Sequence, residues 1–334
     1  MRQSKMLAVS SLALLVAACG GGSNDDTANK NTSTLPVVVT TKDVAIQFAA
    51  QANGADVKCG TVNTMTNLGL TKKTAQLQDL RFYISEVNLI NSKGEAVPVT
   101  LKNNDFQNYG VALLDFEDAT GACENDKTGS AETNNLLLGK INEGNYTGIQ
   151  FLLGVPDTGL DNAGKTVLLN HSDVMIMQKP LDIMAMGWFW QAGRRFLKVE
   201  LKPEGGVTNQ NDTLDNTADD TTAIDGAWPI HLGASNCVDN GIAVSELQRF
   251  QCTNLNTPTI KLTNFDATKQ KIVLDLSALL ANSNISVNQN NAVGCMSHPD
   301  DKECPAIFAA LGIDLATGKT STSKTQTVFK VVNK

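Results

Sequence analysis

The sequence predicts a mainly β protein: an antiparallel β-sandwich or barrel-like single domain with long loops and few short helices. Three observations support this class. Short runs rich in β-branched and aromatic residues recur along the chain, turn residues separate them, and helical periodicity is scarce. Short strands with turn signals between them are typical of all-β sandwiches and barrels. Residues 36–334 are assigned to this domain, a length that can bury a sizeable core.

The expected strands follow one another along the whole domain, and helical signals fall only at Ala278–Asn284 and Ala306–Leu311. Residues Pro203–Ala227, rich in Asn, Asp and Thr, predict a low-complexity insert. Its aspartates lack EF-hand spacing, so a solvated loop is favoured over a calcium site. The strand candidates are Val37–Gln51, Leu77–Leu101 with a turn at Ser92-Lys93-Gly94, Tyr109–Asp118, Asn145–Pro156, Thr257–Phe265, Gln270–Leu280 and Thr325–Asn333.

One stretch, Asn170–Leu201, concentrates the side chains that carry chemistry. It holds His171, one of 3 histidines, and Trp188 and Trp190, two of 3 tryptophans. Its second half predicts a β-hairpin with Gly193 near the turn. Alternation along a strand puts both tryptophans on one face, beside each other. The stretch also contains four of the 8 methionines, Met175, Met177, Met184 and Met186.

The N-terminus predicts export and a lipid anchor. Residues 1–19 have a basic start, an apolar core and small residues before Cys19, which is typical of a secretory signal. The ending Leu15-Val16-Ala17-Ala18-Cys19-Gly20 resembles a bacterial lipobox, in which Cys19 becomes the lipidated first residue. Residues 20–35 predict a disordered polar tether. Because Gly20 rather than Asp follows the cysteine, an outer-membrane lipoprotein is expected, on the periplasmic face or cell surface of a Gram-negative bacterium.

Charge and hydropathy argue against nucleic-acid binding and against a membrane-spanning helix in the mature chain. The net charge is −7 and the chain has no basic run, which argues against nucleic acid. No apolar segment after residue 19 approaches the roughly 20 residues that a membrane-spanning helix needs. The lipid is therefore the only membrane attachment expected.

The cysteine count predicts disulfides. The chain has 7 cysteines, and setting Cys19 aside leaves six, an even number behind an export signal. A thiolate metal cluster is the alternative, but the sequence contains no CxxC pair. We favour the sequential pairing: Cys59 with Cys123, Cys237 with Cys252, and Cys295 with Cys304.

Six motifs occur in an order that points to a known family. They are LRFYISEVNLI (Leu80–Ile90), NYTGIQFLLGVP (Asn145–Pro156), NHSD (Asn170–Asp173), MGWFWQAGRRF (Met186–Phe196), HLGASNC (His231–Cys237) and GCMSHPDDKEC (Gly294–Cys304). In these motifs the chain resembles the MbnP-like periplasmic proteins, also called metallo-mystery pair four-Cys motif proteins. Gly187 departs from the usual bulky residue, and Arg194 with Arg195 stands where Tyr-Lys is common.

The resemblance implies copper as the cofactor and a partner that modifies the protein. Proteins of this family are paired with an MbnH-like diheme c-type cytochrome related to peroxidases, which oxidises a tryptophan to kynurenine. Carried over to this chain, the copper ligands are His171 and His231, and the modified residue is Trp188 or Trp190. The chain itself is then the substrate of that oxidation and not an enzyme.

The residue chemistry agrees with this implication. Imidazole suits copper, and thioethers of nearby methionines are soft secondary donors for Cu(I). An indole nitrogen is only a hydrogen-bond donor, whereas kynurenine offers an aniline nitrogen and a ketone. With 3 histidines, the chain cannot form a histidine-rich sink for metal.

Each candidate also has a structural interpretation. His171 is compatible with a plain loop residue and His231 with a turn cap, and paired tryptophans on a strand are often sandwich core. His298 ranks third as a ligand, because Pro299-Asp300-Asp301 predicts an exposed turn. Arg194 and Arg195 either steer the partner or form a solvated face.

Two other function classes remain open. An enzyme is disfavoured because the sequence has no GxSxG, HExxH or phosphate-binding loop. A non-metal outer-membrane β-sandwich lipoprotein for binding or adhesion is the main alternative, since neighbouring tryptophans stack on sugars. That alternative needs exposed tryptophans, whereas a copper site needs His171 and His231 to converge beside Trp188 and Trp190. Import, storage and detoxification of copper are equally compatible with the sequence.

Overall fold

The computed structural model describes residues 40–60, 65–125, 131–188, 193–210, 223–224, 226–241, 250–289 and 292–334. The expected signal peptide (1–19), its Cys19 and the tether (20–35) lie outside these residues, as does Trp190. All the described residues belong to one unit, Val39–Lys334. None of the helices among them is both long enough and apolar enough to cross a membrane.

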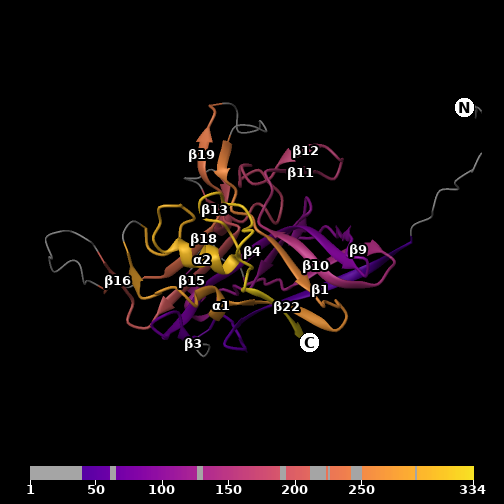
Figure 1. Ribbon diagram of the computed structural model, residues 1–334. Helices are drawn as coiled ribbons and strands as arrows, with labels where there is room; N and C mark the ends of the chain where they lie inside the picture. The colour runs from indigo at the N-terminus through magenta and orange to yellow at the C-terminus, as the bar shows by residue number, and fades with distance from the viewer. Residues whose placement is uncertain are drawn as a thin grey trace, which may run out of the picture. The chain divides into compact units, whose positions relative to one another are not determined.

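The larger sheet is organised around one long strand, β4 (Lys73–Asn91). Its main path has the order β18-β15-β4-β10-β21 (Figure 1); the short strands β3, β5 and β8 also pair with β4, and β7 pairs with β8. All pairs in this sheet are antiparallel. The other strands are β3 (Met65–Leu68), β5 (Ala96–Pro98), β7 (Gln107–Asn108), β8 (Val111–Asp115), β10 (Tyr146–Leu153), β15 (Leu197–Pro203), β18 (Trp228–Leu232) and β21 (Thr259–Thr263).

The second sheet has the order β24-β22-β1-β9-β6, with β2 beside β1. Its pairs are antiparallel except β1 with β22, which run parallel. The predicted sandwich is antiparallel, so this pair is a departure. Parallel neighbours need a long connection, and most of the chain lies between β1 and β22. The strands are β1 (Thr41–Ala52), β2 (Ala55–Asp56), β6 (Thr100–Leu101), β9 (Leu136–Asn142), β22 (Gln270–Asp275) and β24 (Phe329–Asn333).

Aromatic side chains from both sheets meet in the core. Phe48 of β1 contacts Phe82 of β4 and Phe151 of β10 edge to face, with ring centroids 6.1 Å and 5.9 Å apart. Phe329 of β24 contacts the same two rings at 5.8 Å and 5.5 Å. Edge-to-face packing adds to the area that these rings bury. The two sheets therefore form a sandwich, which confirms the predicted mainly β class.

Two sequence predictions need correction in their local detail. The strand predicted for Gln270–Leu280 ends at Asp275, whose carboxylate accepts hydrogen bonds from the amides of Ser277 and Ala278 and starts helix α1 (Leu276–Leu280). The predicted helix near the C-terminus is confirmed as α2 (Cys304–Leu311).

The insert 203–227 is not a plain loop, because β16 (Val207–Asn209) pairs with β17 (Ala223–Ile224) and with β23 (Val287–Asn288). Its central aspartates lie outside the described residues.

Short two-stranded ribbons and 3-10 turns lie outside the two main sheets. Three two-stranded ribbons lie on the upper side of the view in Figure 1, where the proposed site is found. They are β11 (Thr158–Leu160) with β12 (Thr166–Leu168), β13 (Gly187–Trp188) with β14 (Gly193–Arg194), and β19 (Ser235–Asp239) with β20 (Phe250–Asn254); the 3-10 turns are Gly121–Asn125 and Met184–Met186.

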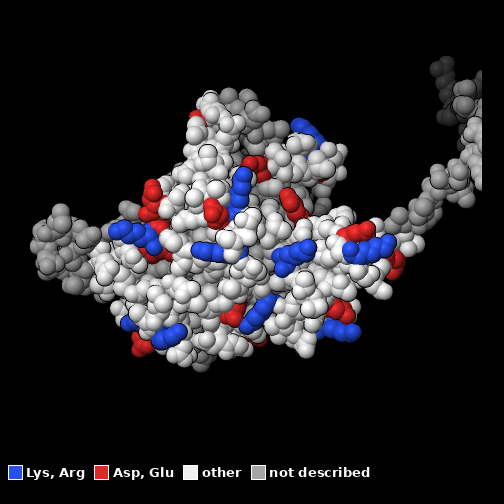
Figure 2. Space-filling view, viewed as in Figure 1, with Lys and Arg blue, Asp and Glu red and all other residues white. Residues whose placement is uncertain are grey.

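The three disulfides pair as the sequence predicted: Cys59 with Cys123, Cys237 with Cys252, and Cys295 with Cys304. The first closes the longest loop, with a sequence separation of 64 between its cysteines, and so constrains the unfolded chain most. On the face shown in Figure 2, the charged residues that are described stand mostly singly, with both signs mixed and no extended basic patch. This distribution agrees with the absence of a basic run in the sequence.

Candidate metal centre

His231 lies on β18, buried among the side chains of the larger sheet. Its side chain is 10% exposed, and Nε2 is 2.8 Å from Oε1 of Glu200 on the neighbouring strand β15. Burial lowers the pKa of His231, although the hydrogen bond to Glu200 acts in the opposite direction. The imidazole is therefore neutral at pH 7, Nε2–H donates to the carboxylate, and Nδ1 is the nitrogen with a lone pair for a metal.

Trp188 packs beside His231. The indole is 1% exposed, and its ring centroid is 6.5 Å from that of His231, with the planes at 81°. Gly233 makes this position possible, because a Cβ there would lie 2.4 Å from Cε3 and Cζ3 of Trp188. Gly233 of the HLGASNC motif therefore leaves the space that Trp188 of the MGWFWQAGRRF motif occupies.

His171 lies next to Gly193, the cross-strand partner of Trp188 in the β13–β14 ribbon. Trp188 is directly opposite Gly193 in this ribbon, and opposite residues of an antiparallel pair point to the same face. A Cβ on Gly193 would lie 3.3 Å from Nδ1 of His171. The His171 side chain, 3% exposed, thus faces the same side as the indole. Gly193 leaves room for both rings.

The Nε2 side of His171 has a different environment. Nε2 lies 3.2 Å from Nδ2 of Asn170, 3.4 Å from Sγ of Cys252 and 3.6 Å from Oδ1 of Asp157. The ring also tilts over Phe250, with centroids 5.4 Å apart. His171 therefore stands between the tryptophan ribbon and the Cys237–Cys252 disulfide.

The structure thus brings together three of the predicted site residues. His171, Trp188 and His231 come from a turn, a hairpin and a sheet strand; the indole contacts the ring of His231, and Gly193, the cross-strand partner of Trp188, lies next to His171. Trp190 lies outside the described residues. His298 is at the surface, with its side chain 46% exposed and its Nδ1 3.7 Å from Oδ2 of Asp300 in the same loop. The turn-like residues around it correctly predicted this exposure.

Arg194 contradicts both sequence interpretations, because it is neither a solvated residue nor a surface group that can steer a partner. It is 1% exposed, and its guanidinium donates to the carbonyls of Leu169, Asn170, Ser172 and Leu181. The carbonyls of a tight turn offset the cost of burying the charge. Arg194 therefore holds the turn that carries His171.

Arg195 is also a structural donor. Its Nη1 donates to the carbonyls of Ala185 and Gly187. These carbonyls belong to the 3-10 turn and to the strand that precede Trp188, and the Arg195 amide donates to the Met186 carbonyl, 2.8 Å away. The paired arginines thus fix the two sides of the tryptophan hairpin.

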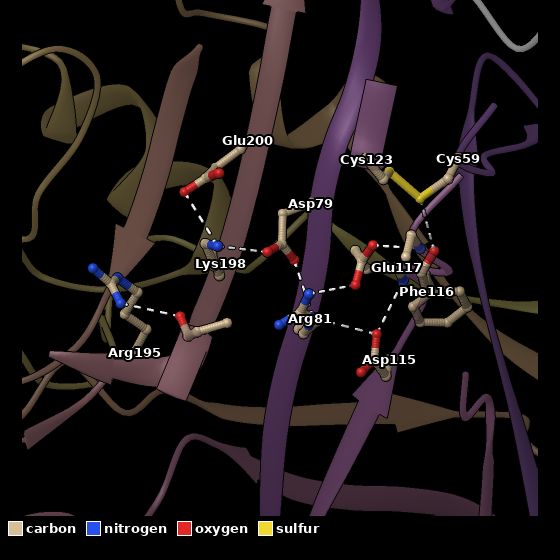
Figure 3. Close-up of polar contacts among 12 residues, drawn as sticks. Cys59, Asp79, Arg81, Asp115, Phe116, Glu117, Cys123, Arg195, Lys198 and Glu200 are labelled. Carbon is tan, nitrogen blue, oxygen red and sulfur yellow. Dashed lines mark hydrogen bonds and ion pairs between the residues drawn. A yellow bond between two sulfur atoms is a disulfide. The ribbon is translucent and has the colours of Figure 1, made fainter. Parts of the chain in front are cut away.

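The His231–Glu200 pair continues into a buried row of charges (Figure 3). His231 is opposite Lys198 on β15, Lys198 is opposite Arg81 on β4, and Arg81 is opposite Asp115 on β8. Lys198 Nζ is 3.4 Å from Oε1 of Glu200. The row therefore begins at the candidate metal ligand and crosses four strands.

Acidic groups balance the two cations of this row. Asp79 lies 2.5 Å from Lys198 Nζ and 3.4 Å from Arg81 Nε, and Arg81 Nη2 is 2.5 Å from Oε2 of Glu117. Burial raises the pKa of Asp115 to about 7, against the opposing effect of Arg81. Charges this deeply buried need partners on both sides. Alternating polar residues in the apolar strand β4, Asp79 and Arg81, were the available sequence signal.

Comparison with known proteins agrees with this architecture. The sequence profile of the MbnP family matches residues 41–297. Among solved structures, MbnP from Methylosinus trichosporium is similar with 33% sequence identity and a TM-score of 0.73, over 88% of this chain and 99% of that one. No curated protein sequence matches the chain. The profile and the structural similarity together show that the chain belongs to the MbnP family.

Proposed function

We propose that this protein binds copper at a site formed by His171, His231 and Trp188 after oxidation of the tryptophan to kynurenine. The observations that carry the proposal are the contact between the buried indole of Trp188 and the buried imidazole of His231, and the position of buried His171 beside Gly193, the cross-strand partner of Trp188. Membership of the MbnP family, and the copper chemistry that the sequence resemblance implies, support the same reading.

The residues present fit a copper ion. His231 is neutral because burial lowers its pKa, and neutral imidazole is a good copper ligand. Intact Trp188 offers no lone pair, since its indole nitrogen is only a donor. Cleavage of the C2–C3 bond of the indole, with gain of oxygen and loss of one carbon, leaves an aniline nitrogen and a ketone at the same position. Copper bound there would be held by nitrogen donors of the kind that suit this metal.

The other residues of the site position these donors. Glu200 accepts from Nε2–H of His231 and so directs Nδ1 away from β15. Arg194 and the side chain of Asn170, whose Oδ1 accepts from the Arg194 amide at 3.0 Å, tie the His171 turn to the hairpin. Because these elements are rigid, little ordering is needed when the metal binds.

The proposed setting is the periplasmic side of the outer membrane, with Cys19 lipidated. The three disulfides support a route through an oxidising compartment. In this setting a diheme c-type cytochrome of the MbnH type is the oxidant of Trp188. The chain is the substrate of that reaction and performs no catalysis of its own.

The alternative of a sugar-binding or adhesion module is weakened by burial. Stacking on a sugar needs an exposed indole, but Trp188 is 1% and Trp228 is 0% exposed. Trp228 belongs to the core of β18 and donates to the Val287 carbonyl at 3.3 Å. The described tryptophans are therefore unsuited to that function.

The test uses protein purified from its native host together with the heme partner. A tryptic map should show the mass change of tryptophan to kynurenine on the peptide that carries Trp188, and fragmentation should assign it to that residue. Copper should co-purify with the wild type and with the His298→Ala control, and be lost in His171→Ala and His231→Ala. An unmodified Trp188 in copper-loaded protein would contradict the proposal.

A further inference from the structure

The disulfide between Cys237 and Cys252 lies against His171. Sγ of Cys252 is 3.4 Å from Nε2 of the imidazole. Both sulfur atoms and a ring nitrogen of His171 lie within 4.8 Å of one another. One imidazole and two sulfurs at this spacing form the donor set of a soft metal site once the S–S bond is opened.

We propose that reduction of the Cys237–Cys252 disulfide creates a Cu(I) site made of both thiolates and Nε2 of His171. In the opening step, a dithiol gives two electrons and two protons to the S–S bond and becomes a disulfide itself. Cu(I) then replaces the two thiol protons without changing its oxidation state. The choice of copper rests on the proposed function, while the donor set is given by the structure.

This disulfide is the accessible one of the three. Cys237 and Cys252 are half-buried on the β19–β20 ribbon. Thiol–disulfide exchange requires that the attacking thiol reach a sulfur atom. A reductant should therefore open this bond first. The cysteines of the other two disulfides are all buried: Cys59 is 5% exposed, and Cys123, Cys295 and Cys304 are 0% exposed.

The ribbon keeps the two thiols together after reduction. Cys237 and Cys252 are direct cross-strand partners, and Ser235 pairs with Asn254 at the base of the ribbon. Ser235 Oγ donates to the Ser297 carbonyl at 2.8 Å, and Asn254 Nδ2 donates to the Ala316 carbonyl at 3.0 Å. Both strands are thus anchored to other parts of the domain, and the site does not depend on the S–S bond for its shape.

His171 would link the new site to the kynurenine site. Its Nε2 faces Cys252, and its Nδ1 faces Gly193, the cross-strand partner of Trp188. A neutral imidazole has one nitrogen with a lone pair at a time. Cu(I) on Nε2 therefore prevents Nδ1 from binding a metal on the Trp188 side. The redox state of the disulfide would decide which of the two sites copper occupies.

The experiment is an anaerobic Cu(I) titration of the full mature protein, produced without the heme partner so that Trp188 is unmodified, against a chromophoric Cu(I) chelator, before and after treatment with a dithiol. We expect reduced wild type to bind one more Cu(I) than oxidised wild type and to show thiolate-to-Cu(I) charge-transfer absorption. Cys237→Ser/Cys252→Ser should lose this increment. His171→Ala should weaken it by about tenfold or more, since two thiolates remain. His231→Ala and Trp188→Phe, which disable the proposed kynurenine site, should keep it.

A second measurement does not depend on the folding of the serine variant. Alkylation of reduced wild type should label Cys237 and Cys252 before the other cysteines, and bound Cu(I) should protect both from labelling. The proposal is overturned if reduction adds no Cu(I), if another disulfide opens first, or if the site takes up Zn(II) but not Cu(I). Reduction-dependent Cu(I), together with an oxidised, kynurenine-containing wild type that binds no copper, would overturn only the proposed function.

Discussion

Glu200 accepts a hydrogen bond from His231 across strands β15 and β18, with 2.8 Å between Oε1 and Nε2. This pair fixes the ring of a candidate metal ligand and ties it to the buried charges of the larger sheet. We therefore expect Glu200→Ala to weaken copper binding by about 10- to 100-fold, as loss of a ligand's supporting carboxylate does elsewhere. Competitive titration of matured protein measures this.

Glu200→Gln should have a smaller effect, because its amide oxygen still accepts from Nε2–H. The control is Glu204→Ala, since Glu204 is an exposed residue of the next turn. Equal copper affinities for Glu200→Ala and Glu204→Ala would show that His231 needs no such support.

Gly233 determines whether Trp188 can occupy its position. In Gly233→Ala the new Cβ would meet two indole carbons at 2.4 Å and the Arg194 carbonyl at 2.8 Å, and the backbone oxygen cannot yield. We expect a loss of about 1–3 kcal/mol in the free energy of unfolding, as overpacking in a core typically costs. Tryptophan conversion should fall with it. Chemical denaturation and peptide mass analysis measure the two effects.

A matched control for this substitution is Gly144→Ala. Gly144 is exposed, and a Cβ there meets only the end of the Tyr146 side chain, with its hydroxyl at 3.4 Å. This variant should keep wild-type stability and wild-type conversion. A Gly233→Ala protein as stable as Gly144→Ala would mean that the hairpin moves to accept the methyl group.

Arg194 should be among the most important side chains for the stability of the site. Arg194→Met removes the donor for four backbone carbonyls around His171 and leaves buried acceptors without it. Each lost partner of this kind costs about 1–3 kcal/mol, so we expect a total of at least about 3 kcal/mol. The His171 ring signals in NMR spectra should broaden. Denaturant unfolding gives the free energy.

The comparison variant is Lys179→Met. Lys179 forms a surface ion pair with Asp105 at 3.0 Å, with the two side chains 44% and 69% exposed. Exposed pairs contribute about 0–1 kcal/mol, so little change is expected. If both variants lose the same small amount, the Arg194 clamp does not stabilise the fold.

The raised pKa of Asp115 predicts that the free energy of unfolding depends on pH. Burial raises its pKa from 3.8 to about 7 in the folded protein. Folding therefore takes up protons between these values, and stability falls as pH rises through this window, by at most about 1.4 kcal/mol per pH unit. Below pH 3.8 the carboxyl is protonated in both states, and the penalty is absent.

Asp115→Asn isolates this contribution, because an amide oxygen can still accept from the Glu117 amide, 3.0 Å away in the wild type. The variant should gain stability relative to wild type as pH rises from 4 to 7 and then stay level. Urea unfolding across this range measures the difference. A difference that does not change with pH would mean that Asp115 is already ionised in the folded protein.

The sequence by itself determined the features that local patterns encode. Alternating apolar residues gave the main strands of the sandwich, because a half-buried strand has a period of two. The sequential cysteine pairing was also predictable, since Cys237 and Cys252, like Cys295 and Cys304, are close along the chain. Six ordered motifs identified the family and named His171, His231 and either Trp188 or Trp190 before any contact between them was known.

Only the tertiary structure decided how these residues meet. Trp188 reaches His231 because Gly233 has no side chain, and it shares a face with His171 because Gly193 lies opposite it. Neither relation is a local pattern, since each depends on strands that pack from distant parts of the chain. The same holds for Arg194. Because desolvating a charge is costly, sequence reasoning expects an arginine side chain to be exposed. In the structure the carbonyls of the His171 turn accept hydrogen bonds from the Arg194 guanidinium and make its burial favourable.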